Sequence, residues 1–258
     1  MSTSQTVIHV RGHAPEAVEQ ALAAIFAGEG RARALRLEGT YSAVLRRVME
    51  PELDASYRYL LLRPHADAPW TPVFELGNHT VGLEAELSRA LNGAAVFTTF
   101  VYGDAVAGYR LARDGAEVDR YLSDPTYFLD GEDDPAGTTA EAVDPSREAD
   151  LVEHEHGHPE RFADLLPAGT APDDFWRVVL APGWWEEHAG TPPPADATDE
   201  ADAADEAADD DALVDEQDRM RCIGLALELW GPEEYPLAQD PEELADALAG
   251  PAIVLAFA

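Results

Sequence analysis

Short runs of alternating apolar and polar residues in the first half of the chain restrict its fold more than any other feature. Residues 34–38 have the sequence Ala-Leu-Arg-Leu-Glu, and residues 41–47 and 57–63 have the same character. A period of two places successive side chains on opposite faces, so each run predicts a strand with one buried and one solvated face. Such strands must pair, because an unpaired strand leaves buried backbone groups without hydrogen-bond partners.

A helix is predicted ahead of these strands, after a short strand at residues 7–10. Residues 14–28 place Val18, Leu22 and Ile25 on one face, with the 3.6-residue period of an amphipathic helix. A proline in the first turn and a glycine at the end mark its boundaries.

The order strand, helix, strands then recurs. A second helix is predicted over residues 81–92, and the Asp114-Gly115 pair is typical of a tight turn between two strands. The strands of this second unit are predicted over residues 72–76, 94–102, 105–113 and 117–122. We therefore predict an α+β (or α/β) fold in which residues 1–128 form a mixed sheet from two βαβββ-type units.

Part of the second unit has a recognisable progression of motifs. Residues 101–104 are Val-Tyr-Gly-Asp, the Asp-Gly turn comes next, and residues 123–128 are Ser-Asp-Pro-Thr-Tyr-Phe. Residues 83–128 resemble a group of uncharacterised bacterial proteins with the same strand–Asp–strand–Gly–strand progression and an S-x-P-x-YF ending. The resemblance implies a sheet in this region and implies no activity.

The negative charge of the chain is confined almost entirely to its second half. The formal net charge is −34, of which residues 1–63 contribute +1, residues 64–128 contribute −5 and residues 129–258 contribute −30. All 17 basic residues are arginines, and 46% of all residues are apolar, enough for a sizeable core. The acidic excess therefore belongs to the residues beyond the sheet domain.

Two tracts concentrate this excess. Residues 130–155 contain ten acidic residues and one arginine, and residues 196–211 contain nine acidic residues and no base. The second tract comes after three prolines and has no large apolar side chain to bury, so nothing offsets its ordering entropy and its charge repulsion. We predict that residues 191–212 form a disordered acidic Ala/Asp/Glu linker. It is either a solvated spacer or a lure for basic partners, and we favour the spacer.

The rest of the second half is predicted to be mainly helical. Residues 129–190 are expected to pack on the sheet domain as an acidic loop and short helices, and residues 213–258 to form a C-terminal helical segment. Helices are predicted over residues 159–166, 173–180, 214–230 and 241–248, with an edge strand over residues 253–257.

Residues 154–158, His-Glu-His-Gly-His, match the H-E-x-x-H pattern of zinc-dependent hydrolases. On a helix, His154 and His158 project from one face and bind zinc, while Glu155 activates the metal-bound water as general base. Pro159 directly follows the second histidine and disfavours a helical conformation there. We therefore favour a solvated polar loop, with catalytic or adventitious zinc as the alternative, and expect no other cofactor.

Three further residues are candidates for a binding surface. Trp184 and Trp185 come directly after a Pro-Gly pair, where two aromatic rings suit either a binding surface or a cap on the core. Asp104 lies between two predicted strands and is either a functional carboxylate or a turn former, and we favour the turn. Cys222, the single cysteine, falls within a predicted helix and is expected to be a small buried hydrophobe.

Composition excludes several classes of protein. One cysteine excludes an internal disulfide framework. No apolar stretch approaches the roughly 18 to 20 residues of a membrane span, and the first residues lack the charged start of a signal peptide. The negative field repels the phosphates of nucleic acids. We therefore expect a soluble cytoplasmic protein that binds neither membrane nor nucleic acid.

Three functional hypotheses remain. The first is a non-enzymatic interaction or regulatory protein, of the immunity type, that binds a basic partner through its acidic surface. The second is a zinc-dependent hydrolase built on His154, Glu155 and His158. The third is a protein without such a partner, whose acidity and lack of lysine reflect salt adaptation or coding bias. The charge map favours the first hypothesis.

Overall fold

The computed structural model describes residues 5–40, 43–44, 47, 55–63, 69–76, 82–102, 106–124, 156–180, 223–224, 227–229 and 252–258. The strands are β1 (Gln5–Arg11), β2 (Arg33–Gly39), β3 (Tyr57–Leu61), β4 (Trp70–Glu75), β5 (Val96–Tyr102), β6 (Val106–Arg113), β7 (Ala116–Leu122) and β8 (Ala252–Phe257). The helices with described bounds are α1 (Pro15–Gly28), α3 (Leu83–Ala90), the 3₁₀ helix η2 (Pro159–Phe162) and α5 (Pro172–Leu180).

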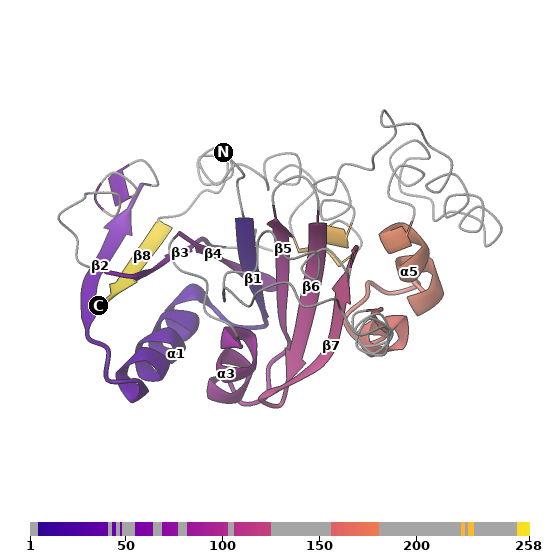
Figure 1. Ribbon diagram of the computed structural model, residues 1–258, viewed down its shortest axis with the longest axis horizontal. Helices are drawn as coiled ribbons and strands as arrows, with labels where there is room; N and C mark the ends of the chain where they lie inside the picture. The colour runs from indigo at the N-terminus through magenta and orange to yellow at the C-terminus, as the bar shows by residue number, and fades with distance from the viewer. Residues whose placement is uncertain are drawn as a thin grey trace, which may run out of the picture.

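All eight strands belong to one sheet, in the order β2-β8-β3-β4-β1-β5-β6-β7 (Figure 1). Every neighbouring pair of these strands is antiparallel. The α+β class is confirmed, but these strands pair in antiparallel fashion throughout and not in the mixed fashion that we predicted. Helix α3 connects β4 to β5, which run in the same direction, yet β1 lies between them. The crossover therefore produces no parallel pair.

The C-terminal strand β8 lies inside the sheet, between β2 and β3 (Figure 1). A strand at residues 253–257 is confirmed, but the edge position predicted for it is wrong. The end of the segment 213–258, predicted to be helical, is thus a strand of the same sheet as the N-terminal half. Every residue of β8 is buried, because a strand covered on both faces needs no polar side.

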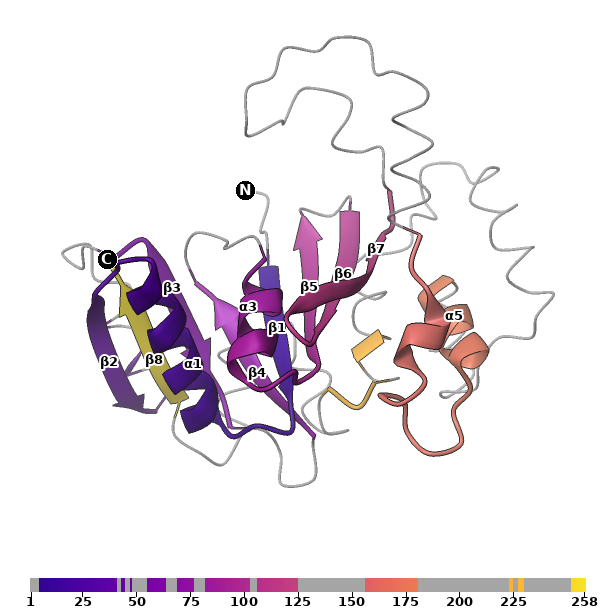
Figure 2. The ribbon, with the colours of Figure 1, turned by 90° about the horizontal axis from the view of Figure 1, so that it is seen from below.

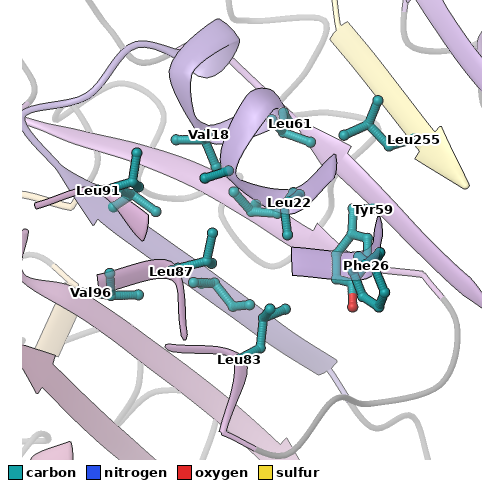
Figure 3. Close-up of a cluster of buried hydrophobic side chains, with 14 of the residues drawn as sticks. Val18, Leu22, Phe26, Tyr59, Leu61, Leu83, Leu87, Leu91, Val96 and Leu255 are labelled. Carbon is teal, nitrogen blue, oxygen red and sulfur yellow. The ribbon is translucent and has the colours of Figure 1, made fainter. Parts of the chain in front are cut away.

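Helices α1 and α3 cover one face of the sheet (Figure 2). Their side chains meet those of the strands in a single cluster (Figure 3), which includes Val18, Leu22, Phe26, Leu83 and Leu87 from the helices and Tyr59, Leu61, Val96 and Leu255 from the sheet. Glu19 of α1 also pairs with Arg33 at 3.1 Å and with Arg36 at 2.7 Å, both on β2. These ion pairs tie the helix to the edge of the sheet.

The opposite face is covered by different segments on its two halves. Over β4 to β7, the aromatic side chains of the sheet pack against η2, α5 and residues near 223–229; this cluster includes Trp70, Phe97, Tyr109, Tyr121, Phe162, Phe175, Ile223 and Leu227. Over β8, β3 and β4, Val44 packs against Leu60, Phe74 and Val254. The segment 156–180, which comes after the first acidic tract, is therefore part of the packed core.

Local predictions succeed where turn chemistry and periodicity agree. Helix α1 matches the prediction for residues 14–28, and the Asp114-Gly115 turn has φ angles of 52° and 77°, as a tight hairpin turn requires. The strand predicted over residues 41–47 is wrong, because Ala43, Val44 and Arg47 are helical. Of these three residues only Val44 reaches the core, so the alternation seen in the sequence does not correspond to a strand face.

Other predictions fall wholly or partly outside the described residues. Ile223 and Gly224 are helical, as expected for the helix over residues 214–230, and most of the residues of that helix lie outside. Residues 227–229 are described and are not helical, so the predicted end of this helix is wrong. The linker 191–212 and the helix over residues 241–248 also lie outside. The helix predicted over residues 159–166 begins at Pro159 as expected, but it is a 3₁₀ helix that ends at Phe162, and residues 163–166 form turns and a bend.

Burial of β8 leads to a stability prediction. Leu255 is fully buried beneath α1, so Leu255→Ala is expected to lower the free energy of unfolding by about 2–5 kcal/mol. The matched variant Leu35→Ala, at a half-buried position of the edge strand β2, is expected to lose less. Urea unfolding monitored by circular dichroism measures both, and equal losses would contradict the interior placement of β8.

His9 of β1 makes stability depend on pH. The side chain is buried, and its burial lowers the pKa of His9 from 6.5 to about 3. Between these values the unfolded chain binds a proton at this site and the folded chain does not, so stability falls as the pH falls from 6.5 towards 3. The slope from this group is at most about 1.4 kcal/mol per pH unit. Urea unfolding at a series of pH values measures this slope, and His9→Gln is expected to flatten it.

Candidate functional site

A carboxylate is buried in the edge strand β7 and accepts hydrogen bonds from two segments. The Asp119 side chain has no exposed surface. Its Oδ2 accepts the phenol O–H of Tyr109 at 2.9 Å and the backbone N–H of His158 at 3.2 Å. Its Oδ1 lies 2.9 Å from Nδ1 of the His158 ring. We call Tyr109, Asp119 and His158 the carboxylate cluster.

The β6–β7 hairpin brings Tyr109 and Asp119 together. Their strands pair with Leu111 opposite Asp119 and Tyr109 opposite Tyr121. Because strand side chains alternate between faces, Asp119 and Tyr121 point to the same face, the one that carries the aromatic core. The Asp-Gly turn sets this register by closing the hairpin.

The segment before η2 brings His158 to the same place. His156 makes a single antiparallel backbone bridge with Tyr121, at the open edge of β7. Gly157 then turns the chain with φ of +76°. His158 is extended, with φ −137° and ψ 98°, and Pro159 starts η2. Phe162 of η2 anchors the segment by packing edge-to-face on Phe97 and Tyr109.

Burial dominates the electrostatics of the cluster. Desolvation raises the pKa of Asp119 above its usual range, although hydrogen bonds from His158 and Tyr109 favour the charged form. Burial and the neighbouring Asp119 charge raise the pKa of Tyr109 well above its usual value. When Asp119 is ionised it only accepts hydrogen bonds, so Nδ1 of a neutral His158 ring carries the proton. The His158 side chain is 51% exposed, which leaves Nε2 on the outer side of the ring.

Only one of the three residues of the predicted zinc motif is described. His158 is extended and its Nδ1 contacts Asp119; His154 and Glu155 lie outside the described residues. Residues 156–158 are not helical, so the helix that would place both histidines on one face does not continue through them. The proline after His158 explains this, as the sequence suggested. Among the described residues, no group of three or more His, Cys, Asp or Glu side chains is arranged to hold a metal ion.

The other predicted site residues, Asp104, Trp184 and Trp185, lie outside the described residues. Sequence reasoning missed Asp119 and Tyr109. A signal was present: Asp119 shares the inward face of β7 with Tyr121, and a carboxylate on an inward face calls for donors. Nothing in the sequence indicates that His158, 39 residues away, supplies two of them.

Eleven of the 13 arginines among the described residues bind other groups of the fold. Their side chains bind carboxylates or backbone carbonyls, as seen for Arg11, Arg31, Arg33, Arg36, Arg58, Arg63, Arg89, Arg110, Arg113, Arg120 and Arg177. The described residues contain 16 acidic residues and 13 arginines, and the remaining residues contain 35 acidic residues and four arginines. The described fold is thus close to neutral, with a formal charge of −3, and the other residues carry −31.

Comparison with known proteins adds no family assignment. No protein-family model, no curated protein and no solved structure matches the chain. Within the described residues, no helix is both long enough and apolar enough to cross a membrane.

The tight turn at Gly157 leads to a second stability prediction. A Cβ at this position would lie 2.6 Å from the Tyr109 hydroxyl and 2.7 Å from the Trp176 ring. Gly169 has a positive φ as well, but nothing lies within 4 Å of its Cβ position. Gly169→Ala is therefore expected to lose about 1–2 kcal/mol from backbone strain, and Gly157→Ala about 1–3 kcal/mol more from overpacking. Thermal unfolding of the two variants measures the difference, and equal losses would contradict the packing around the carboxylate cluster.

Proposed function

We propose that the protein is a cytoplasmic, non-enzymatic interaction or regulatory protein of the immunity type, which binds a basic protein partner through its acidic residues. The division of charge carries this proposal. The described fold has nearly as many arginines as acidic residues, whereas the remaining residues have 35 acidic residues and four arginines.

The arginines of the fold support the proposal because most of those described already bind a carboxylate or a backbone carbonyl. Glu19 binds Arg33 and Arg36, and Asp164 binds Arg113 at 2.8 Å. An arginine held in such a pair is poorly placed to neutralise an acidic residue elsewhere. The negative charge outside the described residues is therefore expected to be met by counterions or by a partner.

A strong negative charge affects both the rate at which the protein meets a partner and the choice of partner. A strongly negative surface accelerates encounter with a positive one and disfavours partners of the same sign. The same argument disfavours nucleic acids, whose phosphates are repelled. Attraction of positive surfaces and repulsion of nucleic acids both favour a basic protein as the partner.

Salt dependence tests the proposal. The full chain is used to capture partners from extracts of the source cells, and the partner identified is then purified and titrated calorimetrically at about 0.1 M and about 1 M NaCl. The Debye length falls from about 10 Å to about 3 Å between these conditions, so the affinity is expected to fall roughly tenfold or more. An affinity that is unchanged or stronger at high salt would count against the proposal.

Two variants separate charge from other properties of the acidic tracts. In one, the nine acidic residues of 196–211 are changed to Asn and Gln; in the other, the same residues are kept and their order is scrambled. The neutralised variant is expected to bind more weakly, and the scrambled one to bind like the natural chain. The same pair of variants in residues 130–155 shows which tract the partner uses. Full binding by both neutralised variants would overturn the proposal.

A further inference from the structure

Strand β2 lies at one end of the sheet, and among the described strands it has a neighbour, β8, on one side only (Figure 1 and Figure 2). Four of its seven residues are exposed. The outer side of an edge strand carries backbone N–H and C=O groups with which a further strand can pair. The pairing of β2 with β8 is irregular between Arg33 and Leu35, and it is regular over residues 35–39. We call residues 35–39 the β2 edge.

The β2 edge has one charged face and one apolar face. Arg36 and Glu38 share the face that carries α1, where Arg36 lies 2.7 Å from Glu19 and 3.2 Å from Glu38. The side chains of Arg36 and Glu38 are 36% and 41% exposed. Leu35 and Leu37 are half-buried on the opposite face. Opposite charges therefore stand two residues apart on an exposed strand.

This arrangement is self-complementary. In an antiparallel pair of two copies with a two-fold axis at Leu37, the two Leu37 side chains meet. Arg36 of each copy then lies opposite Glu38 of the other. Leu35 lies opposite Gly39, which has no positive φ, so that its backbone does not require glycine. Opposite residues of an antiparallel pair share a face, so the unlike charges meet on one face and the apolar residues on the other.

The neighbouring registers match less well. A two-fold axis at Arg36 would bring two arginines together, and an axis at Glu38 would bring two glutamates together. Like charges directly opposite each other are destabilising. An axis at Leu35 would place Arg36 opposite Ala34, without a charge pair. Of these four registers, the one about Leu37 pairs unlike charges.

Arg36 has donors for a second carboxylate. A guanidinium offers five N–H donors. Arg36 forms three hydrogen bonds, two with Glu19 and one with Glu38 of the same chain. A carboxylate from another copy can therefore be added without loss of the contact between α1 and β2.

We propose that two copies of the chain associate edge to edge through the β2 edge, in antiparallel register about Leu37. The eight-stranded sheets of the two copies then form one continuous sheet. The described residues have a formal charge of −3, so repulsion between two described folds is weak. This association does not involve the basic partner, so either proposal can fail while the other stands.

Sedimentation equilibrium of the full chain tests the association. The mass is expected to rise from 27.9 kDa towards twice that value as the protein concentration is raised. A mass that stays at 27.9 kDa up to the highest soluble concentration would overturn the proposal. That result would favour another occupant for this edge, such as an extended peptide.

A charge reversal tests the surface. Glu38→Arg places arginines opposite each other at two symmetric places, so the dissociation constant of the dimer is expected to rise about tenfold or more. Glu29→Arg is the matched control, because Glu29 is 37% exposed and also pairs with an arginine two residues away, Arg31. It is expected to leave the dissociation constant unchanged. Circular dichroism checks the folding of both variants, and equal effects of the two would overturn the proposal.

A disulfide tests the register. In a chain with Cys222→Ala, Leu37→Cys places two thiols opposite each other, with Cα atoms about 4.5–5.5 Å apart, a separation that a disulfide bridges. In the control Leu35→Cys, the two thiols are offset by about 13 Å along the strands. Mild oxidation is expected to give a covalent dimer with Leu37→Cys and not with Leu35→Cys. Equal yields from the two variants on a non-reducing gel would overturn the proposal.

Discussion

The sheet depends on strand β8, which is buried on both of its own faces. This strand completes the sheet between β2 and β3, so the sheet is not finished until residues 252–257 are in place. The chain leaves the sheet after β7, at one edge, and returns as β8 near the other edge. A buried carboxylate without a partner is strongly unfavourable, so the acidic residues that the described fold buries need ion-pair or hydrogen-bond partners.

The same requirement explains how charge is used within the fold. The three buried carboxylates of the described residues have partners: Glu19 binds two arginines of β2, Glu84 of α3 lies 3.7 Å from Arg110, and Asp119 accepts three hydrogen bonds. Arginine serves this purpose well because its planar guanidinium offers several donors at once. The result is a nearly neutral scaffold and a highly charged remainder, the division on which the proposed binding function depends.

The carboxylate cluster fastens the segment that contains His158 to the edge strand of the sheet. The hairpin β6–β7 supplies Asp119 and Tyr109, and the returning segment supplies His158, so the cluster both anchors that segment and orients a surface imidazole. The histidine that first suggested a zinc site therefore has a structural partner that the motif does not contain. Its neighbours in the motif, His154 and Glu155, lie outside the described residues, and Pro159 accounts for the extended backbone at His158.

Most local elements of the first half, the hairpin turn at Asp114-Gly115 and the division of charge can be read from the sequence without a structure. They depend on the period of the apolar residues, on turn chemistry and on composition, all of which act over a few neighbouring residues. The positions of β1 between β4 and β5 and of β8 inside the sheet, and the meeting of His158 with Asp119, emerge only from tertiary packing. The physical reason is that strand order and the partners of a buried carboxylate depend on which distant segments exclude water together. An apolar strand such as β8 carries no mark of its neighbours in its own sequence.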